Sequence, residues 1–161
     1  MLLWQPYHPA ILRTGTYREG NEVLIRKSNI TIKSRKGEWA IIELPYQTSG
    51  ENSAVRFYSE VSNCKLQNVE IIGGFYAVCV DIKWGWHGDD DYVAANNIII
   101  EDCKLHDSRY DVVKIKSNCK NITIRYNEIY KAGRSIAGIQ STNGEGNAEG
   151  IDNVNGDNMK V

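Results

Sequence analysis

The amino-acid sequence predicts an all-β protein, and specifically a right-handed parallel β-helix, in which short strands stack in successive coils. The segments Asn97–Ile100 and Asn121–Ile124 repeat one short pattern, and a third strand-like run, Asp111–Lys116, lies between them. All three runs are rich in β-branched residues and lack a helical period. A repeat of roughly 20 to 30 residues built only from strands is typical of a solenoid. We expect about four to five coils with an uncapped C-terminal end.

The length of the chain predicts one domain that spans residues 1–161, and its charge indicates which partners are not expected. The chain has 161 residues, enough for one hydrophobic core but too few for two large ones. Its 19 Lys and Arg residues balance 20 Asp and Glu residues, so no electrostatic attraction to nucleic acid or to an acidic membrane is expected. No apolar run is long enough for a transmembrane helix.

The first half of the chain alternates short apolar runs with turn residues. Each run ends at Gly, Asn or Ser, which is the pattern of a strand followed by a turn. The segment Pro45–Ser53 is rich in Ser, Gly and Asn and predicts a loop. The expected strands are Ile11–Tyr17, Val23–Ile25, Asn29–Ile32, residues 37–44, Ala54–Tyr58, Asn68–Gly74 and Val78–Lys83.

The second half continues this pattern around two polar insertions. The spacing from Val69 to Ile98 is longer than the later repeat from Ile98 to Ile122, and the segment Trp84–Tyr92 is expected to hold the extra residues as a projecting loop. Residues 141–149 form the second insertion. The chain stops inside what looks like a new coil, so we expect a longer β-helix or a second copy that covers the open end. The remaining strands are expected at Cys103–His106, Asn127–Tyr130, Gly150–Val154 and Asn158–Val161.

Asparagines recur at one predicted corner of the coil. A stacked ladder of asparagine side chains can satisfy the backbone groups of such turns, and it explains the recurrence better than glycosylation does. The expected members are Asn29, Asn68, Asn97, Asn121 and Asn158.

The cysteines and His106 show no recognised metal-ligand spacing. We expect the cysteines to be small buried coil residues, and one disulfide between stacked coils remains an alternative whose pairing the sequence does not choose. The four cysteines are Cys64, Cys79, Cys103 and Cys119.

A column of charged residues is predicted on the outer face of the coils. Side chains alternate inward and outward along a strand, so the apolar members of each run fix the register. The outward column would contain Asp81, Lys114 and Asp152, with Lys83 and Lys116 beside it. One interpretation is an ion-pair ladder on a solvated face. The other is a groove for an acidic sugar chain, where carboxylates hold Ca²⁺ and a lysine acts as a base.

The run from Asp111 to Asn121 resembles β-helix polysaccharide lyases of two related kinds. In the chondroitinase B and alginate lyase family (family 6), an acidic residue lies five positions before a catalytic lysine that is followed by serine. Asp111, Lys116 and Ser117 match that spacing. The resemblance implies Lys116 as the base, and we expect Lys114 to be a second catalytic residue. The arginine that this family uses about one coil later has no counterpart at the matching position, and the nearest arginine is Arg134.

The second resemblance is to the family 9 pectate lyases. There an Asp-Gly-Phe-x-x-Lys strand is followed one coil later by Asp-Asp-Gly-Ile-Asp, which carries Ca²⁺ ligands. The segments Asp111–Lys116 and Ala148–Asp152 look similar, with Ala148 in place of one carboxylate. The resemblance implies Asp111, Glu149 and Asp152 as ligands of Ca²⁺. The base of that family lies in a later coil.

Aromatic side chains flank the most acidic stretch of the chain, Asp89–Asp91. As a structural feature this stretch is a solvated loop tip, whereas exposed aromatic rings beside it would mark a binding surface on which sugar rings stack. The residues expected to bind substrate are Trp84, Trp86, Tyr92, Lys83 and Arg134.

The predicted function is a Ca²⁺-assisted polysaccharide lyase that cleaves uronic-acid polymers by β-elimination. Its partner would be an acidic polysaccharide and its location extracellular, although Met1–Trp4 is too short and lacks the basic start of a signal peptide. The alternative is a non-catalytic β-helix, either a scaffold or a module for glycan binding or assembly, which includes a homo-oligomer formed through the open end.

Overall fold

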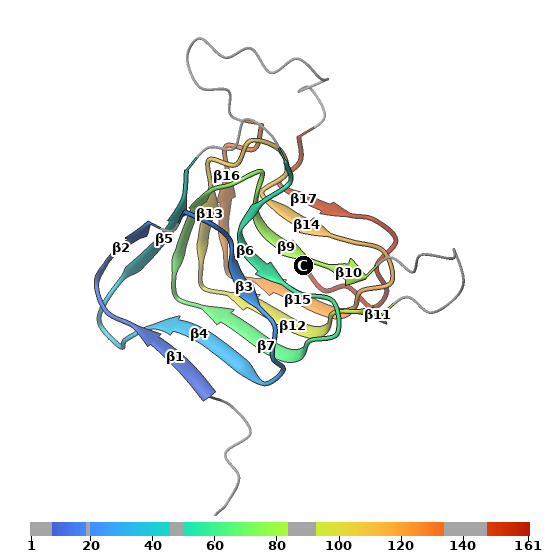
Figure 1. Ribbon diagram of the computed structural model, residues 1–161, viewed down its shortest axis with the longest axis horizontal. Helices are drawn as coiled ribbons and strands as arrows, with labels where there is room; N and C mark the ends of the chain where they lie inside the picture. The colour runs from blue at the N-terminus through green and yellow to red at the C-terminus, as the bar shows by residue number, and fades with distance from the viewer. Residues whose placement is uncertain (1–7, 19, 46–49, 84–92, 134–147) are drawn as a thin grey trace, which may run out of the picture.

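Three parallel sheets surround one apolar core (Figure 1). The computed structural model describes residues 8–18, 20–45, 50–83, 93–133 and 148–161, and these residues form strands and no helix. We call the three sheets A, B and C, in the order in which the chain first enters them. The chain visits them in turn and then returns to sheet A, so each strand of these sheets pairs in parallel with strands from neighbouring turns of the chain. An all-β chain wound through parallel sheets is compatible with the predicted β-helix. The described part of the chain contains no helix with the length and hydropathy that a membrane span requires.

Sheet A contains the Asn–Ile repeat that was recognised in the sequence. Its inward positions form two apolar ladders, and Leu66, Ile100 and Ile98 in them are fully buried. Burial of each such side chain contributes about 1.5–3 kcal/mol relative to exposure. The strands, in spatial order, are β1 (His8–Leu12), β4 (Ile30–Ser34), β7 (Ser62–Gln67), β12 (Asn96–Glu101) and β15 (Lys120–Arg125).

Sheet B follows sheet A after a short corner. Ile42, Ile71 and Leu105 lie level on its inner face and are buried. Buried positions alternate with less buried ones along β5 and β8, which is the pattern of a sheet with one face in the core. The strands are β2 (Gly15–Arg18), β5 (Ala40–Leu44), β8 (Glu70–Gly73), β13 (Lys104–His106) and β16 (Glu128–Tyr130).

Sheet C closes each turn of the chain. Phe57, Val80 and Ile115 lie level across it and are fully buried. A short antiparallel hairpin, β10 (Ile82–Lys83) with β11 (Val93–Ala94), follows β9. The strands of sheet C are β3 (Val23–Ile25), β6 (Ser53–Phe57), β9 (Tyr76–Val80), β14 (Val113–Ile115) and β17 (Ile151–Asn153).

The corner before sheet A is built from asparagines with left-handed backbone. Asn63 has φ 56° and Asn97 has φ 52°, a region that Asn tolerates better than most residues. Asn97 Nδ2 donates to Asn63 Oδ1 at 3.2 Å, and Asn158 Nδ2 donates to Asn121 Oδ1 at 2.5 Å. Two pairs of stacked asparagines are therefore linked, one of them through Asn63, which was not among the predicted members. Asn68 lies at the next corner, between sheets A and B.

The predicted alignment of Asn68–Val69 with Asn97–Ile98 is wrong. Ile98 pairs with Cys64 in the preceding turn of the chain and with Ile122 in the following turn. Strand β7 was not expected from the sequence, because polar outward residues separate its two buried members, Cys64 and Leu66. The turn from Cys64 to Ile98 is thus longer than the turn from Ile98 to Ile122.

Two expected strands are divided in the structure. The run Ile11–Tyr17 turns at Arg13 and Thr14, and the run Val78–Lys83 turns at Asp81, whose Oδ1 accepts a hydrogen bond from Ile82 N at 2.8 Å. Both breaks are corners where the chain passes from one sheet to the next element. Local β propensity continues through such corners, so propensity alone does not reveal them.

All four cysteines are buried and none forms a disulfide. Burial is the main reason that the pKa of the Cys79, Cys103 and Cys119 thiols is raised to about 12. The prediction of small buried coil residues is confirmed. A disulfide between stacked coils does not form.

Candidate functional site

A row of outward side chains crosses sheet C. In register these positions are Leu24, Arg56, Cys79, Lys114 and Asp152. The predicted column places Lys114 beside Asp152 correctly, but Asp81 is not level with Lys114, because Cys79 occupies that position. The slip is two residues, which keeps the same face outward.

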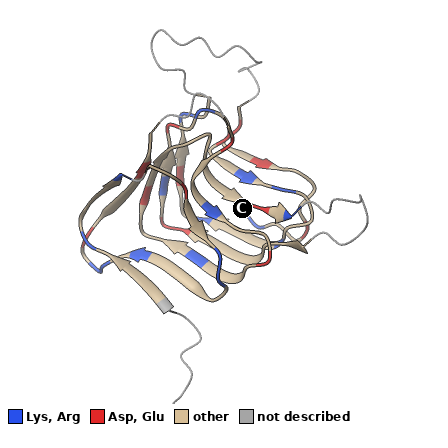
Figure 2. Cartoon of the chain, in the orientation of Figure 1, with Lys and Arg blue, Asp and Glu red and all other residues tan. Residues whose placement is uncertain are grey.

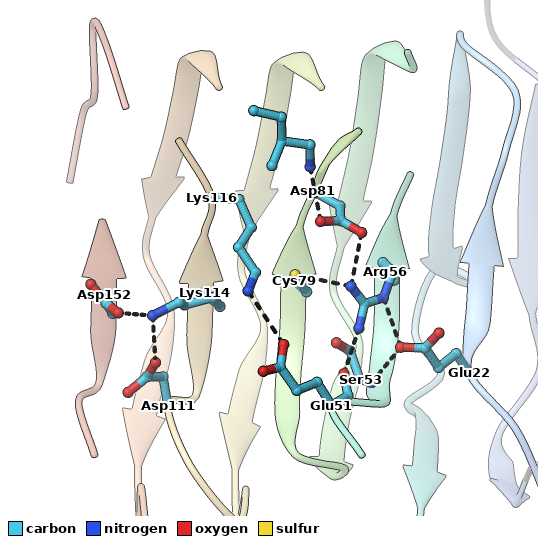
Figure 3. Close-up of polar contacts among 11 residues, drawn as sticks. Glu22, Glu51, Ser53, Arg56, Cys79, Asp81, Asp111, Lys114, Lys116 and Asp152 are labelled. Atoms are coloured by element: carbon cyan, nitrogen blue, oxygen red, sulfur yellow. Dashed lines mark hydrogen bonds and ion pairs between the residues drawn. The ribbon is translucent and has the colours of Figure 1, made fainter. Parts of the chain in front are cut away.

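Lys114 lies between two carboxylates (Figure 3). Its Nζ lies 3.3 Å from Asp111 Oδ2 and forms an ion pair with Asp152 Oδ2 from the neighbouring strand. The Asp111 side chain is only 1% exposed, and its Oδ1 accepts a hydrogen bond from the backbone N–H of Glu149 at 2.9 Å. The sequence motif is therefore brought together around an ammonium group.

The environment of this cluster shifts the ionisation of Asp111 and Lys114. Burial is the main reason that the pKa of Asp111 is raised, and the Glu149 N–H and Lys114 only partly oppose it. Burial also disfavours the charge of Lys114, but the hydrogen bond to Asp152 and the charge of Asp111 outweigh it and raise the pKa of Lys114. Lys114 is consequently held protonated, as a fixed cation rather than a base.

Lys116 projects from the end of β14 on the same face. Its Nζ lies 3.4 Å from Glu51 Oε2, and its side chain is 18% exposed whereas that of Glu51 is 61% exposed. The same Nζ lies 5.5 Å from the centre of the Tyr76 ring. An ion pair with an exposed carboxylate is weak, so a ligand can displace Glu51 from Lys116 at little cost.

The residues suggested as calcium ligands do not fit a calcium site in this arrangement. Ca²⁺ takes six to eight oxygen ligands, and the space between Asp111 and Asp152 holds the Lys114 ammonium instead. Glu149 contacts Asp111 through its backbone N–H, and an N–H group donates a hydrogen bond and cannot be a ligand of Ca²⁺. Across the described residues, no group of three His, Cys, Asp or Glu side chains is arranged to hold a metal ion.

Arg56 organises the other end of the row (Figure 3). Its guanidinium forms ion pairs with Glu22 at 2.7 Å and Asp81 at 2.8 Å, and its Nη1 lies 3.6 Å from Cys79 Sγ. Glu22 and Arg56 lie 34 residues apart in sequence, and neither was predicted as a site residue. No local motif marks them, because their contact depends on the length of the turn between them.

Most of the residues expected to bind substrate lie outside the described part of the chain. Trp84, Trp86, Tyr92 and Arg134 belong to this group. Lys83 is described, in β10, and its Nζ lies 3.6 Å from Glu60 Oε1 with both side chains exposed. It pairs with Val93 across the hairpin and not with the Lys114 row.

A second polar cluster, which the sequence did not reveal as a cluster, surrounds His106 on sheet B. Its Nδ1 lies 2.5 Å from Asp107 Oδ2, and its Nε2 lies 3.1 Å from Glu70 Oε1. Burial opposes ionisation of Glu70, but the Trp39 indole N–H and His106 lower its pKa. The imidazole is 8% exposed and stacks on the Tyr130 ring at 4.5 Å, so it has little access to a substrate. These contacts connect neighbouring strands on the outer face of sheet B.

The distribution of charge on the three sheets gives no single-sign surface. Figure 2 shows Lys and Arg interspersed with Asp and Glu on strands of all three sheets. On sheet C the described charges near Lys114, Lys116 and Arg56 are largely compensated by neighbouring carboxylates.

Comparison of the chain with protein-family models, with curated proteins and with solved structures found no match.

Proposed function

We propose that the chain forms a right-handed parallel β-helix of about four to five coils whose sheet C carries a polysaccharide lyase site for uronic-acid polymers. The observation that carries the proposal is the pair of ammonium groups on one outward face. Lys116 has an exposed, displaceable partner, and Lys114 is held protonated two residues earlier. Because such polymers are extracellular, the proposal includes an extracellular location.

The reaction is a β-elimination. The Lys116 ammonium first leaves Glu51 and releases a proton to water. The resulting amine removes the proton at C5 of a uronate unit, and the electrons of that C–H bond form a C4–C5 double bond. The bond from C4 to the bridging oxygen breaks, and the leaving oxygen takes up a proton from water. A base at such a position contributes typically 10²–10⁴-fold to the rate.

Lys114 supplies a fixed positive charge near the uronate carboxylate. Neutralising that carboxylate makes the C5 proton more acidic, which is the role that a cation has in this reaction class. The ammonium of Lys114 is shared with Asp111 and Asp152, so its benefit to a substrate is smaller than that of a free cation.

The test is the ultraviolet absorbance of the unsaturated product. Polygalacturonate, alginate and chondroitin sulfate are each incubated with the wild-type chain, Lys116→Ala and Lys116→Arg, with and without Ca²⁺. We expect product with one polymer and a loss of about 10²–10⁴-fold in Lys116→Ala. Lys104→Ala on sheet B, an exposed lysine paired with Glu128 at 3.7 Å, is the matched control and should keep full activity. Product formation that is equal in Lys116→Ala and wild type would remove Lys116 as the base.

One observation favours the non-catalytic alternative. Lys114 forms ion pairs with two carboxylates, and Lys116 and Arg56 on the same face of sheet C are also paired. The charged residues of this face therefore have the form of an ion-pair ladder. A ladder of this kind stabilises a sheet and needs no substrate. Absence of product with every polymer, from a chain that is folded by circular dichroism, would favour this scaffold over the lyase.

A further inference from the structure

Sheet A carries an open hollow on its outer face, opposite to the core. The hollow has a volume of about 640 Å³ and crosses the sheet from β1 to β15. Its central row, level across the five strands, consists of Pro9, Thr31, Lys65, Ile99 and Thr123. A groove of this size on a regular sheet can accommodate a short stretch of a linear polymer.

The row beside it holds further charges. Lys33 and Arg125 lie in it with Gln67 and Glu101 between them. Glu101 is the carboxylate of this row, and both of its oxygens are occupied: Lys65 Nζ lies 2.9 Å from Oε1, and Arg125 Nη2 lies 2.6 Å from Oε2. Within the described residues Lys33 forms no ion pair, so three cations face one compensated carboxylate. The groove therefore has an excess of positive charge, unlike sheet C.

The remaining described lining combines amides and hydroxyl groups with the apolar side chains of Pro9, Cys64 and Ile99. Amides from the asparagine corner (Asn63, Asn97 and Asn121) border one side, and hydroxyl groups of Thr31 and Thr123 lie in the central row. Amides and hydroxyls suit sugar hydroxyl groups, which donate and accept hydrogen bonds. Single-stranded nucleic acid is held mainly by stacking of its bases on aromatic rings, and among the described residues that line this groove none is aromatic.

We propose that the outer groove of sheet A binds an anionic linear polysaccharide, with Lys33 and Lys65 contacting its carboxylate or sulfate groups. Glu101 holds Lys65 and Arg125 in place through ion pairs, so the positions of these cations are fixed before the ligand arrives. Pre-arranged charges lose less conformational entropy on binding than free lysines do. This groove is on a different sheet from Lys116, and its binding does not depend on the lyase reaction.

Binding is measured by isothermal titration calorimetry at low ionic strength. The probes are polygalacturonate and chondroitin sulfate, with dextran as an uncharged polysaccharide, single-stranded DNA and polyglutamate. The variants are Lys33→Ala, Lys65→Gln and Ile99→Glu, with Lys33→Arg as the charge-conserving substitution and Lys104→Ala as the control on sheet B. Circular dichroism checks that each variant is folded.

We expect an acidic polysaccharide to bind and dextran not to bind. Lys33→Ala and Lys65→Gln should each weaken binding about tenfold, as loss of one charge-assisted contact does. Ile99→Glu should weaken it further, and Lys33→Arg and Lys104→Ala should bind like wild type. Loss of binding in Lys116→Ala with retention in Lys33→Ala would place the ligand on sheet C and overturn the proposal. Absence of polysaccharide binding, or binding of DNA or polyglutamate alone, would also overturn it.

Discussion

Arg125 donates two hydrogen bonds to one carboxylate oxygen of Glu101 across neighbouring strands of sheet A, from Nε at 2.8 Å and from Nη2 at 2.6 Å. The other oxygen accepts from Lys65 and Gln67, and the Glu101 side chain is 6% exposed. A carboxylate with this many donors is held in its ionised form. The groove on sheet A and the stability of the sheet therefore share one residue.

The first prediction concerns acid stability. Burial opposes ionisation of Glu101, but hydrogen bonds from Lys65 and Arg125 outweigh it and lower its pKa below the ordinary value of 4.5. A lowered carboxyl pKa gives stability that is present above the unfolded value and lost as the pH falls through the folded value. We expect the free energy of unfolding, from urea titrations, to fall below pH 4.5 more steeply in wild type than in Glu101→Gln. Parallel pH profiles for the two chains would contradict this role.

The second prediction concerns Lys114. Lys114→Met leaves Asp111 buried without its cation, and removal of one partner of a buried pair costs about 3–5 kcal/mol. The double variant Lys114→Met/Asp111→Asn should recover much of the loss, because the amide oxygen still accepts from the Glu149 N–H. Lys104→Met, whose pair with Glu128 is exposed, should change stability by about 0.5 kcal/mol or less.

The sign of the pH effect checks the same cluster. Burial raises the pKa of Asp111 above 3.8, so its contribution is fully present below that value and is lost as the pH rises through the folded pKa. Without Lys114 the carboxylate is costlier, so the penalty of Lys114→Met should be smallest in acid and grow toward neutral pH. Equal penalties at pH values on both sides of this window would show that packing, not charge, makes the difference.

The fold could be predicted where strands carry β-branched residues inward. β12 and β15 have isoleucines at their inward positions, whereas β7 has Cys64 and Leu66 between polar outward residues and escaped recognition. Because β7 was not predicted, Asn68 was aligned with Asn97 in the place that Asn63 occupies in the structure. The number of coils depends on such strands, so it could not be read from periodicity alone.

The candidate site could be predicted in part for a similar reason. Lys114 and Asp152 were placed together because alternation fixes which residues face outward. The partner of Lys116, Glu51, lies 65 residues earlier, and no periodicity relates the two. Long-range partners of this kind depend on the lengths of the corners, which vary from one turn of the chain to the next.

The third prediction concerns a corner between sheets A and B. Tyr126 has φ 58° at the position where the earlier turn has Asn68 with φ 50°, and its side chain is 79% exposed. A left-handed backbone costs a non-glycine residue about 1–2 kcal/mol. Tyr126→Gly should therefore raise the free energy of unfolding by roughly 1 kcal/mol, minus the contact of its ring with Arg125. Tyr126→Val, which cannot adopt this conformation without strain, should lower it in the same urea titrations.

The fourth prediction concerns the thiols. Only the thiolate reacts with aromatic disulfide reagents, and burial raises the pKa of Cys79, Cys103 and Cys119 to about 12 and also raises that of Cys64. The native chain should react slowly at mildly alkaline pH, and all four thiols should react at once in denaturant. Fewer than four reactive thiols in denaturant would reveal a disulfide.

The rate in the native chain also measures opening of the coil. A buried thiol reacts only when its surroundings open, so its rate follows the free energy of local unfolding. Cys103 and Cys119 belong to the core and should be protected by most of the global stability. Cys79 lies outside this core cluster, under the Arg56 guanidinium. We expect Cys79 to react first. We also expect Arg56→Lys to accelerate the reaction of Cys79 while the other thiols keep their rates, because the Arg56 ion pairs shield this thiol on sheet C. Uniform acceleration of all four thiols would instead mean that Arg56 acts on global stability.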